Sequence, residues 1–126
     1  MNKKKNILHD LKNHLCQHFR DEILEVILFG SQAMNKENPG SDFDILVILK
    51  SKYDWKTKET IIDLCYDINL KYDIIIDVHV LAEEEMNELR GKQPVYLNAI
   101  QKGIRAWLNI PNSSDGLTIN LSGQAK

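Results

Sequence analysis

Two acidic residues at alternate positions, Asp42 and Asp44, open a strongly apolar run of the sequence. Side chains two positions apart on a strand point to the same face, about 6.6 Å apart along it. Two carboxylates placed in this way repel each other unless a cation lies between them. The pair therefore indicates a site for a divalent metal ion, and magnesium, which prefers oxygen ligands, is the first choice.

A glycine and a serine, Gly30-Ser31, come about ten residues before the acidic pair and directly after a short apolar run. A Gly-Ser turn offers backbone N–H groups and a hydroxyl, which suit an anion such as a phosphate. A phosphate-binding turn beside two metal-binding acids is typical of phosphoryl or nucleotidyl transfer.

A third acid is needed if the site is to hold two ions about 3.5–4 Å apart. Asp77 is the natural candidate, since its neighbours Ile76 and Val78 are apolar and a lone carboxylate there would be costly to bury. Asp73 is the weaker alternative, because it stands at the start of the same run and could be a solvated turn residue.

Helices and strands alternate in the elements that must position these residues. Apolar residues spaced by three and four predict helices over residues 6–20, 56–70 and 94–107, with a short acidic helix over 83–89. Apolar runs predict strands over residues 25–29, 43–49 and 73–81. The helix between the last two strands makes a parallel crossover plausible, whereas the first two could pair antiparallel. The expected fold class is α/β (α+β), with a small mixed sheet packed with helices in a single domain.

Composition and length restrict the function classes. The chain of 126 residues fits one domain, which we expect over 1–108, followed by a polar tail over 109–126. A net charge of −2 gives no electrostatic case for wide nucleic-acid binding. No apolar run approaches the roughly 20 residues of a membrane span, and the start lacks a signal-peptide pattern. Cys16 and Cys65 are interpreted as reduced thiols, and a cytoplasmic location is expected.

The combined pattern resembles the minimal nucleotidyltransferases of the DNA polymerase β superfamily. Their hallmark is an apolar strand, Gly-Ser, a gap of about ten residues and Asp-x-Asp, with a later acid on another strand. Gly30, Ser31, Asp42 and Asp44 match directly, and Asp77 matches by its place on a later apolar strand. The resemblance covers roughly residues 8–107 and implies the nucleotidyltransferase fold.

The resemblance also implies a mechanism. The backbone around Gly30 and Ser31 would bind the β- and γ-phosphates of a nucleoside triphosphate, with ATP as the expected donor. Asp42 and Asp44 would hold the Mg²⁺ that carries the triphosphate and bridge to a second Mg²⁺. Asp77 would bind that second ion and help deprotonate or orient the acceptor hydroxyl. That hydroxyl would attack the α-phosphate and release pyrophosphate.

The chain departs from many relatives just after the Gly-Ser turn. Those relatives continue Gly-Ser-x-Ala-Arg-Gly, whereas this chain keeps Ala33 and then has Met34 and Asn35. Lys36 could replace the missing arginine near the phosphates, although a solvated surface lysine is the simpler interpretation.

The small size implies a partner. Few residues remain to bind an acceptor, so we expect a protein partner or self-association. Such minimal family members are often encoded with a HEPN-type protein in toxin–antitoxin pairs, and some transfer AMP to the toxin. The resemblance therefore implies an antitoxin. A module that neutralises its partner by occlusion without catalysis is the alternative, and adenylylation of a small molecule is a weaker third.

Three histidines could in principle bind metal. His14 and His18 lie four apart in a predicted helix, but no glutamate completes a metalloprotease pattern, so a solvated helix face is expected. His79 would share the strand face of Asp77 and could line the site, although a boundary histidine is the favoured interpretation.

Overall fold

The fold is a four-stranded mixed sheet with helices on both faces. The computed structural model describes residues 3–30, 32–33, 42–88 and 92–106. The strands are β1 (Ile23–Phe29), β2 (Phe43–Leu49), β3 (Ile76–Ala82) and β4 (Ile104–Arg105), in the spatial order β3-β2-β1-β4. β1 runs antiparallel to both β2 and β4, and β2 runs parallel to β3. The predicted fold class, with its antiparallel and parallel pairs, is confirmed.

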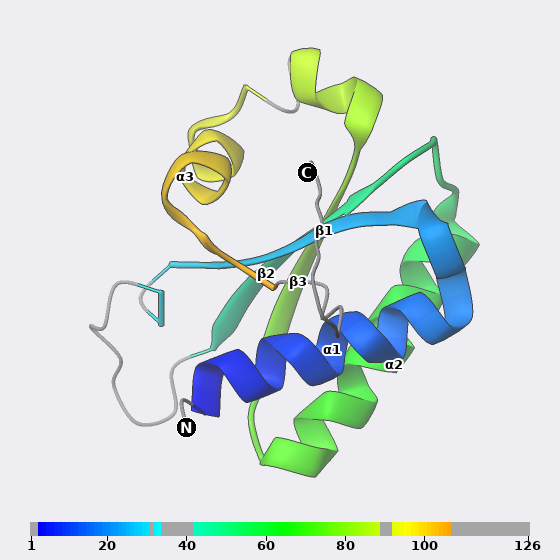
Figure 1. The fold of residues 1–126 in the computed structure, drawn as a ribbon. Coiled ribbons are helices and arrows are strands. Elements are labelled where there is room, and N and C mark those ends of the chain that lie inside the picture. Colours follow the sequence, from blue (N-terminus) through cyan, green and yellow to red (C-terminus); the bar gives the residue numbers. More distant parts are fainter. Residues whose placement is uncertain (1–2, 31, 34–41, 89–91, 107–126) are drawn as a thin grey trace, which may run out of the picture.

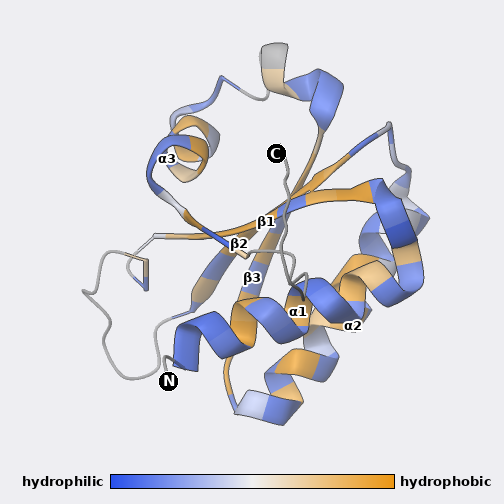
Figure 2. Ribbon diagram, in the orientation of Figure 1, coloured by the Kyte–Doolittle hydropathy of each residue, from blue (hydrophilic) through white to orange (hydrophobic). Residues whose placement is uncertain are grey.

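The helices form two outer layers (Figure 1). They are α1 (Lys3–Phe19), α2 (Trp55–Tyr72) and α3 (Pro94–Lys102), with the short 3₁₀ helices η1 (Arg20–Glu22) and η2 (Glu83–Asn87). Figure 1 shows α1 and α2 on one face of the sheet and α3 on the other. Because both faces are covered, the central strands are mainly hydrophobic, whereas the helices alternate hydrophilic and hydrophobic residues (Figure 2).

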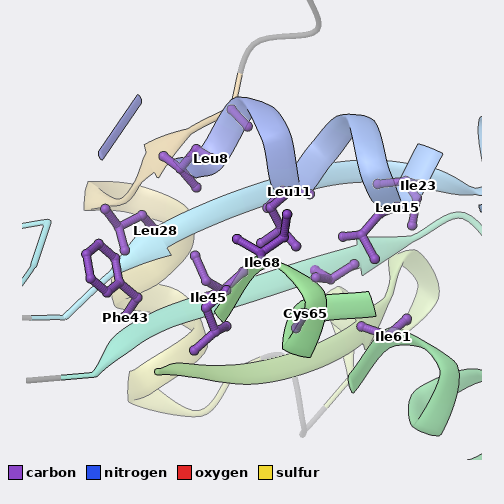
Figure 3. Packing of buried hydrophobic residues seen from close by; sticks show 14 of the residues in the cluster. Leu8, Leu11, Leu15, Ile23, Leu28, Phe43, Ile45, Ile61, Cys65 and Ile68 are labelled. Atoms are coloured by element: carbon purple, nitrogen blue, oxygen red, sulfur yellow. The ribbon is translucent and has the colours of Figure 1, made fainter. Parts of the chain in front are cut away.

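The larger core lies between the sheet and the pair α1 and α2. Alternate residues of β2, such as Ile45 and Val47, point into it and are fully buried. Both belong to one cluster with the apolar face of α1, where Leu8, Leu11 and Leu15 recur at helical spacing. Figure 3 shows Ile45 facing these leucines. This face of α1 is the one that the sequence spacing predicts.

The smaller core lies between the sheet and α3. The intervening residues of β2, Leu46 and Ile48, point to this side together with Phe29 of β1. They pack against Tyr96 and Ala99 of α3. The functional candidates described below share this face, so α3 is the helix that closes the layer around them.

The third strand begins later than the predicted residue 73. Asp73 is the C-cap of α2, with a left-handed φ of 55°, and its N–H donates to the Asn69 carbonyl. The Asn69 side chain then accepts from the N–H of Ile76, the first residue of β3, at 3.0 Å. Asp73 therefore ends a helix and is exposed, which removes it from the acids of the strand.

The last predicted helix is wrong beyond residue 102. α3 ends at Lys102, and the Gly103 N–H donates to the Ala99 carbonyl at 2.8 Å. A Cβ at Gly103 would lie 2.2 Å from Ile27 Cγ2, so the glycine allows the chain to approach β1 closely. The chain then adds β4 to the edge of the sheet, with Ile104 opposite Leu28.

Several further expectations can be compared with the structure. Both cysteines are free thiols, as predicted. Trp55 is 66% exposed and so lies outside the core. The tail expected over 109–126, with its boundary at 108, lies outside the described residues. Within the described part of the chain, no helix has the length and apolar character needed to cross a membrane.

Candidate active site

The site is assembled from the ends of three strands. β1 is antiparallel to β2, so the end of β1 lies beside the start of β2, with Phe29 opposite Asp44. β3 is parallel to β2, so their starts coincide and Asp44 lies opposite Asp77. The strand order thus brings together residues that are far apart in the sequence.

Strand alternation places the functional side chains on the face covered by α3. Asp44 shares the side of β2 that carries Leu46, and Asp77 shares the side of β3 that carries His79 and Leu81. Asp44, Asp77 and His79 each offer one potential ligand atom, and the three atoms all lie within 4.8 Å of one another. Asp44 and Asp77, two of the three predicted acids, are therefore adjacent.

Gly30 lies directly against the carboxylate of Asp44. Its φ is +74°, a conformation that favours glycine, and the Ala33 N–H donates to its carbonyl at 3.1 Å in the turn that follows. A Cβ at Gly30 would lie 2.2 Å from Asp44 Oδ2. In this structure the absent side chain thus makes room for the Asp44 carboxylate, in addition to the phosphate access that the sequence predicts.

The pKa of Asp44 is raised above its ordinary value of 3.8. Burial is the main cause, followed by the charge of Asp77, while His79 acts in the opposite direction. The Asp42 charge and a hydrogen bond with Asp77 raise the pKa further. The Asp44 carboxylate therefore lies in a place where negative charge is unfavourable unless a cation is near.

His79 lies with Asp44 and Asp77, although the sequence favoured a boundary histidine outside the site. Its Nε2 lies 3.5 Å from Asp77 Oδ2. The ring also contacts two aromatic rings, with centroids 5.5 Å from Phe29 and 6.2 Å from Tyr96. The signal was present in the spacing, because residues 77 and 79 must share a strand face, but the contact with α3 was not visible from the sequence.

The remaining predicted site residues are placed differently. Asp42 precedes β2, is exposed and lies outside the group of three ligand atoms, although its charge still acts on Asp44. Ser31 lies outside the described residues, as do Met34, Asn35 and Lys36. The hydroxyl and the departures after Ala33 therefore stay predictions.

A divalent cation fits the donor set. Two carboxylates from neighbouring strands converge, one of them with a pKa raised partly by the other, and a bound cation would relieve this repulsion. Carboxylates are the ligands that magnesium and manganese prefer. Asp44 and Asp77 are the residues that would hold such an ion.

Comparisons with known proteins identify the family of this chain. The nucleotidyltransferase domain family matches residues 8–104. A protein of Methanocaldococcus jannaschii named "Putative protein adenylyltransferase MJ0604" is 36% identical over 88 residues, which cover 70% of this chain and 82% of that protein. A second, "Putative protein adenylyltransferase MJ0141" of the same organism, is 36% identical over 70 residues, covering 56% of this chain and 71% of that protein.

Two solved structures share the fold. A crystal structure of a toxin–antitoxin with AMP-PNP aligns with a TM-score of 0.52 and 20% identity, over 79% of this chain and 72% of that chain. A mutant of the toxin–antitoxin MntA-HpeT aligns with a TM-score of 0.53 and 18% identity, over 85% and 73%. At this identity the likeness concerns the fold.

The fold, together with a family match over most of the chain, defines a transferase of the nucleotidyl class. The chain belongs to the nucleotidyltransferase domain family and is a nucleotidyltransferase.

Proposed function

We propose that this protein transfers AMP from ATP to a hydroxyl group of a partner protein, as the antitoxin of a toxin–antitoxin pair. The observation that carries the proposal is the convergence of Asp44 and Asp77 beside the Gly30 turn. The names of the two curated relatives, both protein adenylyltransferases, support AMP as the group transferred and protein as the acceptor.

The residues have distinct roles in this reaction. Backbone N–H groups near Gly30, with the Ser31 hydroxyl, bind the β- and γ-phosphates. Asp42 and Asp44 would hold the Mg²⁺ of the nucleotide, and Asp44 would share a second ion with Asp77. Asp77 orients the acceptor hydroxyl toward the α-phosphate. The bound ions supply the charge that stabilises the transition state and the leaving pyrophosphate.

A HEPN-type protein is the partner we propose. The likeness in fold to toxin–antitoxin complexes supports this choice, one of them being a complex with AMP-PNP. The described chain has one compact layer of helix on the site face, α3, so a partner would supply the rest of the acceptor surface. The free thiols and the need for ATP are consistent with the cytoplasm.

The test measures transfer of a labelled phosphate from ATP to the partner protein. The protein is incubated with Mg²⁺, a HEPN-type protein encoded beside it, and ATP labelled at either the α- or the γ-phosphate. We expect transfer of the α-label only, because AMP retains the α-phosphate. Asp44→Asn and Asp77→Asn each reduce the transfer rate by about 100-fold or more, the size of effect that loss of an electrostatic contact has at a reacting phosphate.

Asp63→Asn is the matched control, since Asp63 is an exposed acid on α2, the helix on the opposite face of the sheet. It should transfer AMP at the wild-type rate. If the partner is neutralised without label transfer, and the two site variants neutralise it equally well, the protein acts by occlusion and the proposal is wrong.

A further inference from the structure

His79 belongs to the same geometric group as the two carboxylates. Its ligand atom and those of Asp44 and Asp77 lie within 4.8 Å of one another. Ligands about 2.1 Å from one octahedral ion are separated by about 3 Å when adjacent and about 4.2 Å when opposite. The limit of 4.8 Å is only slightly longer than the separation of opposite ligands, so small side-chain rotations would bring the three atoms to a single ion.

The imidazole ring is held in place by its neighbours. Phe29 at the end of β1 and Tyr96 of α3 both contact it, with centroid distances of 5.5 and 6.2 Å. The His79 side chain is 29% exposed. An oriented and partly accessible ring can bind an ion at little further cost in conformational entropy.

The relation between His79 and Asp77 leaves room for an ion. The distance of 3.5 Å from His79 Nε2 to Asp77 Oδ2 is longer than the 2.7–3.2 Å of an ordinary N–H···O hydrogen bond. The imidazole and the carboxylate face each other without forming a short hydrogen bond. Small adjustments would let both bind one cation.

Imidazole changes which cation the site prefers. Magnesium takes oxygen ligands, whereas imidazole nitrogen suits first-row transition ions. Among the first-row transition ions, manganese shares the preference of magnesium for carboxylate oxygens. As a transition ion it also gains more from an imidazole nitrogen than magnesium does. We propose that His79 is a third ligand of the ion held by Asp44 and Asp77, and that it makes the site select Mn²⁺ over Mg²⁺. The inference rests on the proposed function only for the identity of the site.

A second role for His79 must be distinguished from this one. If His79 only pairs electrostatically with Asp77, it competes with cations, and its removal strengthens binding of Mn²⁺ and Mg²⁺ alike. If His79 is a ligand, its removal weakens Mn²⁺ binding and has little effect on Mg²⁺. The two roles therefore predict opposite signs for the change in Mn²⁺ affinity.

The experiment measures metal binding to the full chain without nucleotide or partner. Free Mn²⁺ is followed by electron paramagnetic resonance, and Mg²⁺ affinity is obtained by competition. We expect wild type to bind Mn²⁺ about 10-fold or more tightly than Mg²⁺. His79→Ala should lose about 10-fold in Mn²⁺ affinity, the order seen when groups at metal sites are removed, and less than about 3-fold in Mg²⁺ affinity.

A control and a direct readout complete the test. His18→Ala removes an exposed histidine of α1, on the other face of the sheet, and should bind both ions like wild type. Pulsed electron paramagnetic resonance should detect a nitrogen nucleus coupled to bound Mn²⁺ in wild type and in His18→Ala, but not in His79→Ala. Circular dichroism verifies that each variant is folded.

Each outcome bears on a separate claim. Absence of nitrogen coupling in wild type, or equal effects of His79→Ala on the two ions, overturns the inference. Nitrogen coupling with Mn²⁺ selectivity supports it even if no AMP reaches a partner, in which case only the proposed function fails.

Discussion

Gly30 and the Asp44 carboxylate are so close that a side chain at position 30 would overlap it. We expect Gly30→Ala to lower the free energy of unfolding by about 2–3 kcal/mol, because it adds left-handed strain to overpacking. The same change in an Asp44→Ala background should cost only about 1 kcal/mol, since the atom at 2.2 Å is gone. A double-mutant cycle measured by urea denaturation gives both values, and additive costs would show that the two residues do not share this space.

At the same scale, the period of two along a strand indicated correctly that Asp77 lies on one face with His79. The apolar neighbours of Asp77 suggested a buried acid, whereas its side chain is 55% exposed at the edge of the sheet. The predicted strand over 43–49 agrees with β2 and leaves Asp42 just before it, but spacing alone did not show that Asp42 lies outside the ligand group. The aromatic contacts of His79 depend on the packing of α3, which local spacing does not encode.

At the scale of elements, the sequence predicted the order of helices and strands but not all their ends. Asp73 continued the β-rich run in the sequence, yet the C-cap of α2 takes precedence over the local strand propensity. Ile104 fitted the helical spacing of its segment, yet Gly103 ends α3 and edge pairing with β1 follows. A local cap by Asn69 sets the first boundary, whereas close approach to β1, distant in the sequence, sets the second.

The end of α1 provides a prediction for one element. Arg20 follows the last residue of α1 and has a φ of 57°, a conformation in which glycine is preferred at helix ends. We expect Arg20→Gly to raise the free energy of unfolding by about 0.5–1 kcal/mol, as measured by chemical denaturation. Arg20→Ala keeps the left-handed strain and should give no gain; equal gains from both would assign the effect to the lost charge. AMP transfer should be unchanged, since all of β1 separates Arg20 from Gly30.

At the scale of the whole molecule, the two helical layers have different tasks. α1 and α2 form the larger core and are linked at the surface, where His14 Nε2 lies 2.8 Å from Asp67 and Lys71 Nζ lies 2.9 Å from Asp10. The predicted solvated face of α1 therefore takes part in this link through His14. The α3 layer is smaller and has the acid group, Asp44 and Asp77, at its edge. The larger core on the opposite face therefore supplies most of the stability that offsets the repulsion between these carboxylates.

This arrangement makes the stability of the metal-free fold depend on Asp44. Because its pKa is raised on folding, chiefly by burial and then by Asp77, the folded protein binds the proton more tightly than the unfolded chain. Ionised Asp44 therefore destabilises the fold above the raised pKa. That cost decreases as the pH falls through the raised value and is absent below the ordinary value of 3.8.

Asp44→Asn should therefore be more stable than wild type at neutral pH without divalent ions, by about 0.5 kcal/mol for a partly solvent-screened charge. The amide keeps the shape that fits against Gly30, and the advantage should vanish as the pH approaches 3.8. Urea denaturation across this pH range measures the advantage, with Asp63→Asn as the control that shows none.

Saturating Mn²⁺ should make wild type more stable than Asp44→Asn, since ligand at 100 times its Kd stabilises the binding-competent wild type by about 2.7 kcal/mol. A variant that is less stable than wild type at neutral pH without metal would mean that the Asp44 charge is already compensated within the protein.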